Sequence, residues 1–350
     1  MEKTSPEMYI FETSNLKLQT LNMLCINDHH TDPYFNLAAE EYALKNFTDN
    51  CFMLWRNEPS VIVGCHQNSL AEINVDYVKQ NNIKVVRRLS GGGAVFHDLG
   101  NLNFTFIENS KTDQPINFQK YTQPIIAVLN LLDVDARFEG RNDIVIEGKK
   151  FSGNAEHVHR GRVLHHGTLL FASQLSDLSG ALNANPAKFT GKAIKSVRSR
   201  VTNISSHLKK PLELEVFREM ILRYMMNHYP DCVPYSYTNA DVTAISRLRD
   251  EKYATWDWNF GQSPEYNMAN SLQTGGGHLE IHLDVQNGVI QHARIFGDFF
   301  NIGDIAELER FLCGTPHNET NILQKLEEIQ LSDYFVNVTK EEMFRCMISS

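Results

Sequence analysis

Short apolar segments bounded by turn residues recur along most of this 350-residue chain, and they favour a fold that contains β-sheet. We interpret as strands residues 51–55, 60–64, 83–89, 94–96, 102–107, 144–146 and 167–171. Helical patterns interrupt these strands irregularly, as over residues 118–132, where apolar positions recur at three and four residues. Since strands and helices do not alternate as βαβ units, we predict an α+β fold built on a mixed sheet.

Local signals place several turns and one helix start. Asp32 followed by Pro33 is typical of the N-cap and first residue of a helix. Asn57-Glu58-Pro59 predicts a hairpin between the two strands that flank it, and Glu147-Gly148 predicts a second hairpin.

The last part of the chain has its own pattern. Residues 279–284 alternate in polarity, Asn287-Gly288 is typical of a type I′ turn, and residues 289–296 return as a strand. Helical patterns follow over 305–312 and 321–329, and Thr339-x-x-Glu342 predicts a capping box. We therefore predict an N-terminal extension (1–18), a main domain (19–262) and a small α+β domain (265–350), with the boundary in Gly261-Gln262-Ser263-Pro264.

Charge and cysteine usage exclude several classes of protein. The net charge of −9 argues against nucleic acid or an anionic membrane as a partner. Six cysteines without a CxxC pair fit a reducing compartment, and no apolar run approaches the ~18 residues of a membrane span. The first arginine is Arg56 and no apolar leader precedes it, so we predict a cytoplasmic protein. The sign of the charge is reversed in one segment, because residues 178–212 contain seven lysines and arginines and no acidic residue.

A triple glycine carries the strongest local signal for ligand binding. In Arg87-Arg88-Leu89-Ser90-Gly91-Gly92-Gly93, the glycines allow the backbone to approach a ligand, and its N–H groups can form an anion-binding nest. Side chains alternate along a strand, so only one of the two arginines is expected to face the pocket. The loop matches neither a Walker loop nor a dinucleotide fingerprint. Gly275-Gly276-Gly277 has no nearby Lys or Arg, and we interpret it as a structural turn.

Lysines and histidines give weaker signals. Two lysines beside a tight turn, here Lys149 and Lys150, are typical of a solvated hairpin. Alternatively, one of the two lysines is a point charge that contacts a phosphate and an acyl oxygen. Their spacing does not show which lysine this would be. His157 and His159 could share a strand face, but no further ligand spacing completes a metal site. His165 and His166 are adjacent, so only one can face a pocket from a strand.

Nine motifs in order over residues 20–345 resemble the lipoate–protein ligase A family. They are Asp32-Pro33-x-Phe35-Asn36-Leu37-Ala38-Ala39-Glu40-Glu41, Leu54-Trp55-Arg56-Asn57, Arg87-Arg88-x-Ser90-Gly91-Gly92-Gly93, Ala94-Val95-Phe96-His97-Asp98-Leu99-Gly100-Asn101, Gly140-Arg141-Asn142-Asp143, Lys150-x-Ser152-Gly153-x-Ala155, His165-His166-Gly167-Thr168-Leu169-Leu170, Ser196-Val197-Arg198-Ser199-Arg200-Val201-Thr202-Asn203 and Trp256-x-Trp258-Asn259-Phe260-Gly261-Gln262.

This resemblance implies a biotin/lipoate ligase catalytic domain with a C-terminal accessory domain. It implies that lipoate and ATP, with Mg²⁺, give lipoyl-AMP and pyrophosphate. The lipoyl group then passes to a lysine on an acceptor domain of a 2-oxoacid dehydrogenase E2 subunit or of the glycine cleavage H protein.

The resemblance also implies roles for particular residues. The essential lysine of the family falls on Lys150, which decides between Lys149 and Lys150. The residues expected to bind ATP are Arg88, Gly93, Ala94, Val95, Phe96 and Lys150, and those expected to bind lipoate are Trp55, Arg88, Ser90, Gly91, Gly92, His166 and Lys150. Asp143 is expected near Mg²⁺. The acid-free segment 178–212 is expected to cover the adenylate and to meet an acidic acceptor.

One stretch departs from the family, and two other functions stay open. Gly64-Cys65-His66-Gln67-Asn68-Ser69-Leu70 stands where the family more often has Gly-Arg-x-Gln-Asn-Pro-Trp. An ATP-independent octanoyl or lipoyl transferase would need a cysteine thioester, for which only Cys65 is near a motif. A binding module without catalysis is the other alternative, and Lys150 with the glycine-rich loop argues against it.

Overall fold

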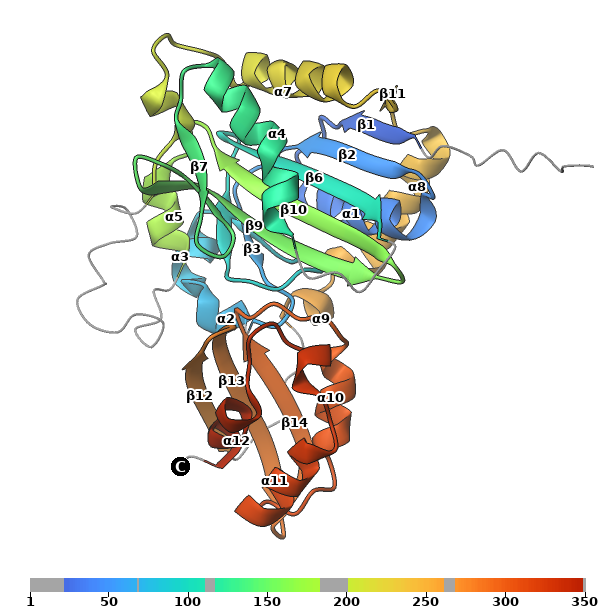
Figure 1. Ribbon diagram of the computed structural model, residues 1–350, viewed down its shortest axis with the longest axis vertical. Coiled ribbons are helices and arrows are strands. Elements are labelled where there is room, and N and C mark those ends of the chain that lie inside the picture. The colour runs from blue at the N-terminus through green and yellow to red at the C-terminus, as the bar shows by residue number, and fades with distance from the viewer. Residues whose placement is uncertain (1–21, 68, 111–116, 183–200, 261–267, 349–350) are drawn as a thin grey trace, which may run out of the picture.

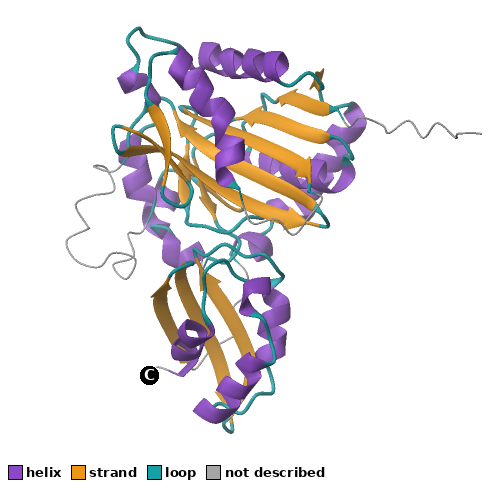
Figure 2. Cartoon of the chain, viewed as in Figure 1, coloured by secondary structure: helices purple, strands orange, loops and turns teal. Residues whose placement is uncertain are grey.

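The computed structural model describes residues 22–67, 69–110, 117–182, 201–260 and 268–348, which form a larger and a smaller unit, one above the other in Figure 1. The larger unit is built on an eight-stranded sheet, and the smaller unit on a three-stranded sheet with its own helices (Figure 2). The predicted extension 1–18 and the predicted boundary at 261–264 lie outside the described residues.

The eight-stranded sheet is mixed, as the sequence predicts. Strands β11, β1 and β2 run parallel to one another, and the remaining neighbours are antiparallel. In sheet order the strands are β11 (Cys232–Tyr235), β1 (Met23–Asn27), β2 (Asn50–Trp55), β6 (Asn101–Asn109), β10 (Arg162–Leu170), β9 (Lys149–His159), β8 (Asp143–Ile146) and β7 (Ala136–Glu139).

Helices cover both faces of this sheet (Figure 1). On one face, α4 (Phe118–Leu131) and α7 (Leu214–His228) pack their apolar side chains against the strands, with Leu129 and Phe217 fully buried. On the other face, α1 (Pro33–Asn46) and α8 (Asn239–Leu248) enclose a second core. Asp32 caps α1 by accepting from the Tyr34 N–H, and Pro33 opens the helix, as predicted.

A small sheet carries the glycine-rich loop. It has the order β4 (Lys84–Arg87), β3 (Ser60–Val63), β5 (Val95–His97), and the loop connects β4 to β5. The short helices α2 (Ser69–Glu72), α3 (Val75–Gln80), α5 (Leu175–Ala181) and α9 (Trp256–Asn259) lie around this sheet (Figure 1).

The predicted hairpin at Asn57-Glu58-Pro59 is wrong. Strand β2 has β1 and β6 at its two edges, so β3 cannot pair with it and joins the small sheet instead. The Asn57 side chain accepts from Asn36 Nδ2 at 2.9 Å and lies 3.0 Å from His97 Nδ1. These contacts bury Asn57, whereas Pro59 is exposed. The second predicted hairpin, at Glu147-Gly148, is confirmed between β8 and β9.

The smaller unit is an antiparallel sheet of β12 (Met268–Thr274), β13 (Gly277–Gln286) and β14 (Val289–Gly297), packed against α10 (Ile305–Leu312), α11 (Glu319–Glu327) and α12 (Lys340–Ile348). Asn287 and Gly288 both have positive φ angles, 52° and 74°, as a type I′ turn requires. Thr339 and Glu342 form the predicted capping box before α12. No helix of the described segments is long and apolar enough to cross a membrane.

Candidate active site

A pocket opens where the glycine-rich loop, the turn before β8 and the strands β9 and β10 meet. Its lining joins apolar side chains to a small number of polar groups, which is typical of a small-molecule site. The lining residues are Leu37, Trp55, Ile62, Arg88, Gly92, Gly93, Ala94, Val95, His97, Asn103, Asn142, Lys150, Gly153, Asn154, Ala155, His166, Gly167 and Thr168.

Arg88 organises the glycine-rich loop from within. Its side chain is only 6% exposed, and its Nη2 donates to the carbonyl oxygens of Gly91 at 2.6 Å and Gly93 at 2.9 Å. Gly92 adopts a φ of 88°, a conformation that glycine adopts without strain. Arg87 points to the opposite side of β4 and donates to the carbonyl of Gln67. The predicted alternation is therefore present, and Arg88 is the arginine that reaches the pocket.

A chain of hydrogen bonds fixes the side chains at the apolar end of the pocket. Trp55 Nε1 donates to Thr105 Oγ1 at 2.9 Å, and this hydroxyl donates to the buried carboxylate of Glu40 at 2.6 Å. His166 Nδ1 lies 3.0 Å from the same carboxylate, and its Nε2 lies 2.6 Å from Ser90 Oγ. The two contacts hold the ring between Glu40 and Ser90, so its orientation is set.

Two residues of the pocket lining carry a buried polar atom without a hydrogen-bond partner among the described residues. His97 Nδ1 accepts from Asn57, which leaves the ring proton on Nε2. Within the described part of the chain, His97 Nε2 and Asn103 Nδ2 are buried and have no hydrogen-bond partner. Burial lowers the pKa of His97 to about 3, so the ring is neutral. Buried donors of this kind are normally satisfied, so these two unpaired N–H groups are unusual features of the residues that line the pocket.

Lys150 enters the pocket from β9. Its Nζ lies 2.8 Å from Asp143 Oδ1 on the neighbouring strand β8. Its backbone carbonyl accepts from the Thr202 N–H at 2.9 Å. Gly153 leaves room for this side chain, because a Cβ there would lie 2.9 Å from Lys150 Nζ. This close approach explains the glycine of the Lys-x-Ser-Gly motif, whereas Lys149 is exposed and does not line the pocket.

The structure brings most of the predicted site residues together. Those that line the pocket are Trp55, Arg88, Gly92, Gly93, Ala94, Val95, Lys150 and His166. Ser90 lies behind the lining, between Arg88 and His166. Gly91 packs against the smaller unit, where its added Cβ would lie 2.3 Å from the Phe299 carbonyl oxygen. Phe96 is buried in a separate core beneath β5, and Asp143 reaches the pocket through its ion pair with Lys150.

Sequence reasoning missed several functional candidates. Glu40 stands in the first family motif, which indicates no role for it, and its partner His166 lies 126 residues further along the chain. Asn142 and Asn154 line the pocket and hydrogen-bond each other, although only Asn142 belongs to a motif position that the resemblance singled out. The signal that could have found Glu40 is its place among the apolar residues of α1, because acidic side chains are seldom buried without a partner.

The described residues contain no cluster of three or more His, Cys, Asp or Glu side chains that could hold a metal ion. His157 and His159 stack on each other with their ring centroids 6.5 Å apart, without further ligands. Asp143 is thus a single carboxylate at the pocket. This donor set fits Mg²⁺ that is bound chiefly by substrate phosphates, rather than a cage built only from protein groups.

A mixed sheet, a glycine-rich loop and a lysine in a partly apolar pocket fit the class of proteins that activate acyl groups. Residues 32–226 match the family model for the lipoyl protein ligase A/B catalytic domain. Residues 263–347 match the model for the bacterial lipoate protein ligase C-terminus.

Sequence relatives and solved structures that are similar to this chain belong to the same family as the two family models. The chain is 44% identical to the lipoate-protein ligase LplJ of Bacillus subtilis over 90% of this chain and 97% of that protein. P. falciparum LipL1 in complex with lipoate superposes with a TM-score of 0.79 and 25% identity, covering 94% of this chain and all of that one. A lipoate-protein ligase A bound with ATP superposes with a TM-score of 0.60 and 28% identity, covering 69% of this chain and 98% of that one. The chain belongs to the lipoate–protein ligase family.

Proposed function

We propose that this chain is an ATP-dependent lipoate–protein ligase that activates lipoate as lipoyl-AMP and then transfers the lipoyl group to a lysine of a lipoyl domain. Acceptors are the E2 subunits of 2-oxoacid dehydrogenase complexes and the glycine cleavage H protein. Residues 19–262 form the catalytic domain and 265–350 the accessory domain. The observation that carries the proposal is that Lys150, Arg88 and the backbone of the glycine-rich loop line one pocket with apolar walls.

Both reactants of the first step, the lipoate carboxylate and ATP, are negatively charged. A lipoate carboxylate oxygen attacks the α-phosphorus of ATP, a P–O bond forms, and pyrophosphate leaves with its electron pair. The Lys150 ammonium stabilises the charge that both reactants bring, and loop N–H groups bind the phosphate oxygens. Asp143 would hold Mg²⁺, which supplies positive charge against the triphosphate.

The lipoyl chain occupies the apolar end of the pocket. Leu37, Ile62 and Trp55 form apolar walls there, and the half-buried His166 ring is held by Glu40. His97 and Asn103, each with a buried donor that has no partner among the described residues, belong to the same lining. In the second step the acceptor lysine amine attacks the carbonyl carbon of lipoyl-AMP, an amide forms, and AMP leaves.

Pyrophosphate exchange tests the first step directly. The protein is incubated with lipoate, Mg²⁺, ATP and labelled pyrophosphate, and incorporation of label into ATP is followed. We expect exchange that depends on lipoate, because reversal of adenylate formation returns the label to ATP. Absence of lipoate-dependent exchange in the wild-type protein would refute the ligase and leave the thioester transferase or a binding module.

The thioester alternative makes an opposite prediction for Cys65. This residue lines a different cavity, between the two units, and burial raises the pKa of its thiol to about 12. A thiol that stays protonated at neutral pH is a poor nucleophile. We therefore expect Cys65→Ser to retain near wild-type exchange and lipoyl transfer. Loss of ATP-independent acyl transfer in this variant, with exchange absent in the wild type, would favour the transferase.

A further inference from the structure

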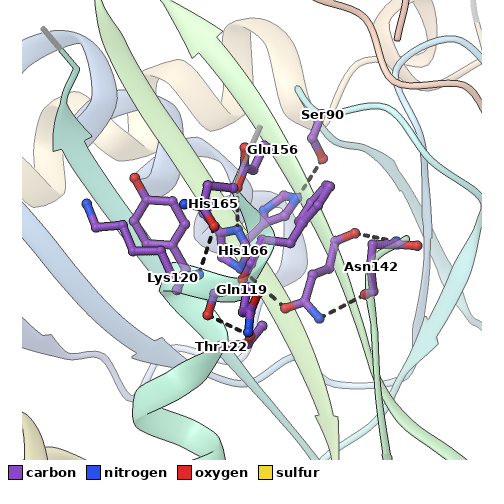
Figure 3. Close-up of polar contacts among 12 residues, drawn as sticks. Ser90, Gln119, Lys120, Thr122, Asn142, Glu156, His165 and His166 are labelled. Carbon is purple, nitrogen blue, oxygen red and sulfur yellow. Dashed lines mark hydrogen bonds and ion pairs between the residues drawn. The ribbon is translucent and has the colours of Figure 1, made fainter. Parts of the chain in front are cut away.

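A buried pair of titratable side chains lies directly behind the pocket and takes no part in the chemistry described so far. His165 Nδ1 lies 2.9 Å from Glu156 Oε1, and the two residues are 0% and 3% exposed (Figure 3). The rings of Phe104, Phe118 and Tyr121 surround His165. The pair bridges the neighbouring strands β9 and β10, which both also line the pocket.

The other ring nitrogen of His165 meets an amide whose orientation is determined by its partners. Asn154 Nδ2 donates to the carbonyl of Asn142 at 3.0 Å and to Ser152 Oγ at 3.2 Å. Both amide protons are therefore used, and Asn154 Oδ1 is the atom that lies 3.3 Å from His165 Nε2. Since Oδ1 can only accept, Nε2 must carry a proton.

This requirement fixes the proton content of the pair. If Nε2 carries the proton of a neutral ring, Nδ1 is an acceptor, and Glu156 must donate to it as a protonated carboxyl group. The only other arrangement is an imidazolium beside a carboxylate, which contains the same number of protons. Burial raises the pKa of Glu156 to about 8 and lowers that of His165, so the neutral arrangement is the one favoured at neutral pH.

Groups on the surrounding elements change the relative stability of the neutral and the charged pair, but the neutral pair stays favoured. A backbone hydrogen bond from Asn117, at the start of α4, and then the charge of Lys120 on α4 lower the pKa of Glu156, but each effect is smaller than that of burial. Lys120 and Tyr121 are themselves hydrogen-bonded to Glu108 on β6. His166, the neighbour of His165 on β10, disfavours a positive charge on His165.

Asn154 connects the pair to the reactive part of the pocket. The Asn142 carbonyl accepts from both the backbone and the side-chain nitrogen of Asn154, and Asn142 Nδ2 donates back to the Asn154 carbonyl. The next residue, Asp143, holds Lys150. Gly167 leaves room for this link, because a Cβ there would lie 2.2 Å from Asn154 Oδ1.

We propose that Glu156 and His165 are positioning residues, whose shared proton orients Asn154 and thereby holds the Asn142–Asp143 turn against Lys150. The inference rests on the proposed ligase function. The same proposal predicts that the activity of the site falls at alkaline pH. When the pair loses its proton, the neutral ring moves its remaining proton to Nδ1 to donate to the Glu156 carboxylate. Nε2 then faces Asn154 Oδ1 with a lone pair, and the amide can no longer keep its two bonds.

The test is the pH profile of lipoate-dependent pyrophosphate exchange between pH 6 and 9.5. We expect the wild-type rate to fall above about pH 8, the pKa to which burial raises Glu156. Glu156→Gln keeps a neutral donor to Nδ1, so it should retain the rate at pH 7 and lose the alkaline decline. His165→Ala should lower kcat by about 10²-fold, because small displacements near a reacting group are costly, with a smaller change in KM for lipoate.

Tyr121→Phe is the matched control. It keeps the ring beside His165 and removes only the hydroxyl that donates to Glu108, so its profile should match the wild type. The inference is overturned if Glu156→Gln retains the wild-type alkaline decline or if folded His165→Ala exchanges at the wild-type rate. Thermal melting establishes that each variant is folded.

Nitrogen NMR of the histidine rings adds a readout that needs no turnover. At pH 7 it should show that His165 is protonated on Nε2. Above about pH 8, the wild type should lose this proton from Nε2, whereas Glu156→Gln should retain it. A bare Nε2 at pH 7 would overturn the inference whatever the activity. Absence of exchange in the wild type with the expected NMR spectrum would refute the ligase function alone.

Discussion

Lys150→Ala is expected to lower the rate of lipoyl-AMP formation by about 10²–10³-fold, the usual effect of removing one preorganised charge-stabilising group. Among the described residues, Lys150 is the lysine that lines the pocket. Its ammonium nitrogen lies 2.8 Å from Asp143 Oδ1. Without it, the α-phosphate and the attacking carboxylate meet with less compensating charge. Pyrophosphate exchange at saturating ATP and lipoate measures the effect on kcat.

Lys149→Ala provides the matched control on the preceding residue. Its side chain is exposed and lies outside the pocket, so exchange should stay near the wild-type rate. Transfer from presynthesised lipoyl-AMP to a lipoyl domain separates the two steps for Lys150→Ala. Equal losses in the two lysine variants would contradict the assignment of Lys150.

Arg88→Lys is expected to lower exchange by about 10²-fold although the charge is retained. The guanidinium binds four acceptors at once: the carbonyl oxygens of Ile62, Gly91 and Gly93, and Ser90 Oγ. An ammonium cannot reproduce that fork. The glycine-rich loop should therefore lose its shape, and the KM for ATP should rise together with the fall in kcat.

Stability should change as well, because buried acceptors would lose their donors at a cost of about 1–3 kcal/mol each in the free energy of unfolding. Arg87→Lys separates the two effects. Arg87 also binds buried carbonyl groups, including those of Gly64 and Gln67, but it points away from the pocket. We expect a comparable loss of stability, measured by chemical denaturation, and a much smaller loss of exchange. If Arg88→Lys lost stability without a change in kcat or KM, Arg88 would be purely structural.

Local chemistry explains which parts of the fold could be predicted. The cap at Asp32, the Glu147-Gly148 hairpin and the Asn287-Gly288 turn depend on residues that are neighbours in the chain. The motif Lys150-x-Ser152-Gly153 is also local, since Gly153 leaves room for the Lys150 side chain three residues earlier. In each case, one side chain and the backbone beside it decide the conformation.

Partners that are distant in the chain could not be predicted in this way. Gly275-Gly276-Gly277 was interpreted as a structural turn, and it does connect β12 to β13. Its Gly276 carbonyl also accepts from Arg141 Nη1 in the larger unit, 135 residues away. Nothing near either residue indicates this contact, because the positions of the two sheets bring them together.

The amino-acid order alone therefore determined the mixed α+β class and the glycine-rich loop after β4, and the family resemblance selected Lys150 as the candidate catalytic lysine. Tertiary structure decided that β3 leaves the main sheet, that Glu40 orients His166, and that Glu156 and His165 support Asn154. The physical reason is that turns, caps and close glycine contacts are short-range. Strand partners depend instead on which sheet edges remain available, and the protonation of a buried group depends on every side chain that surrounds it.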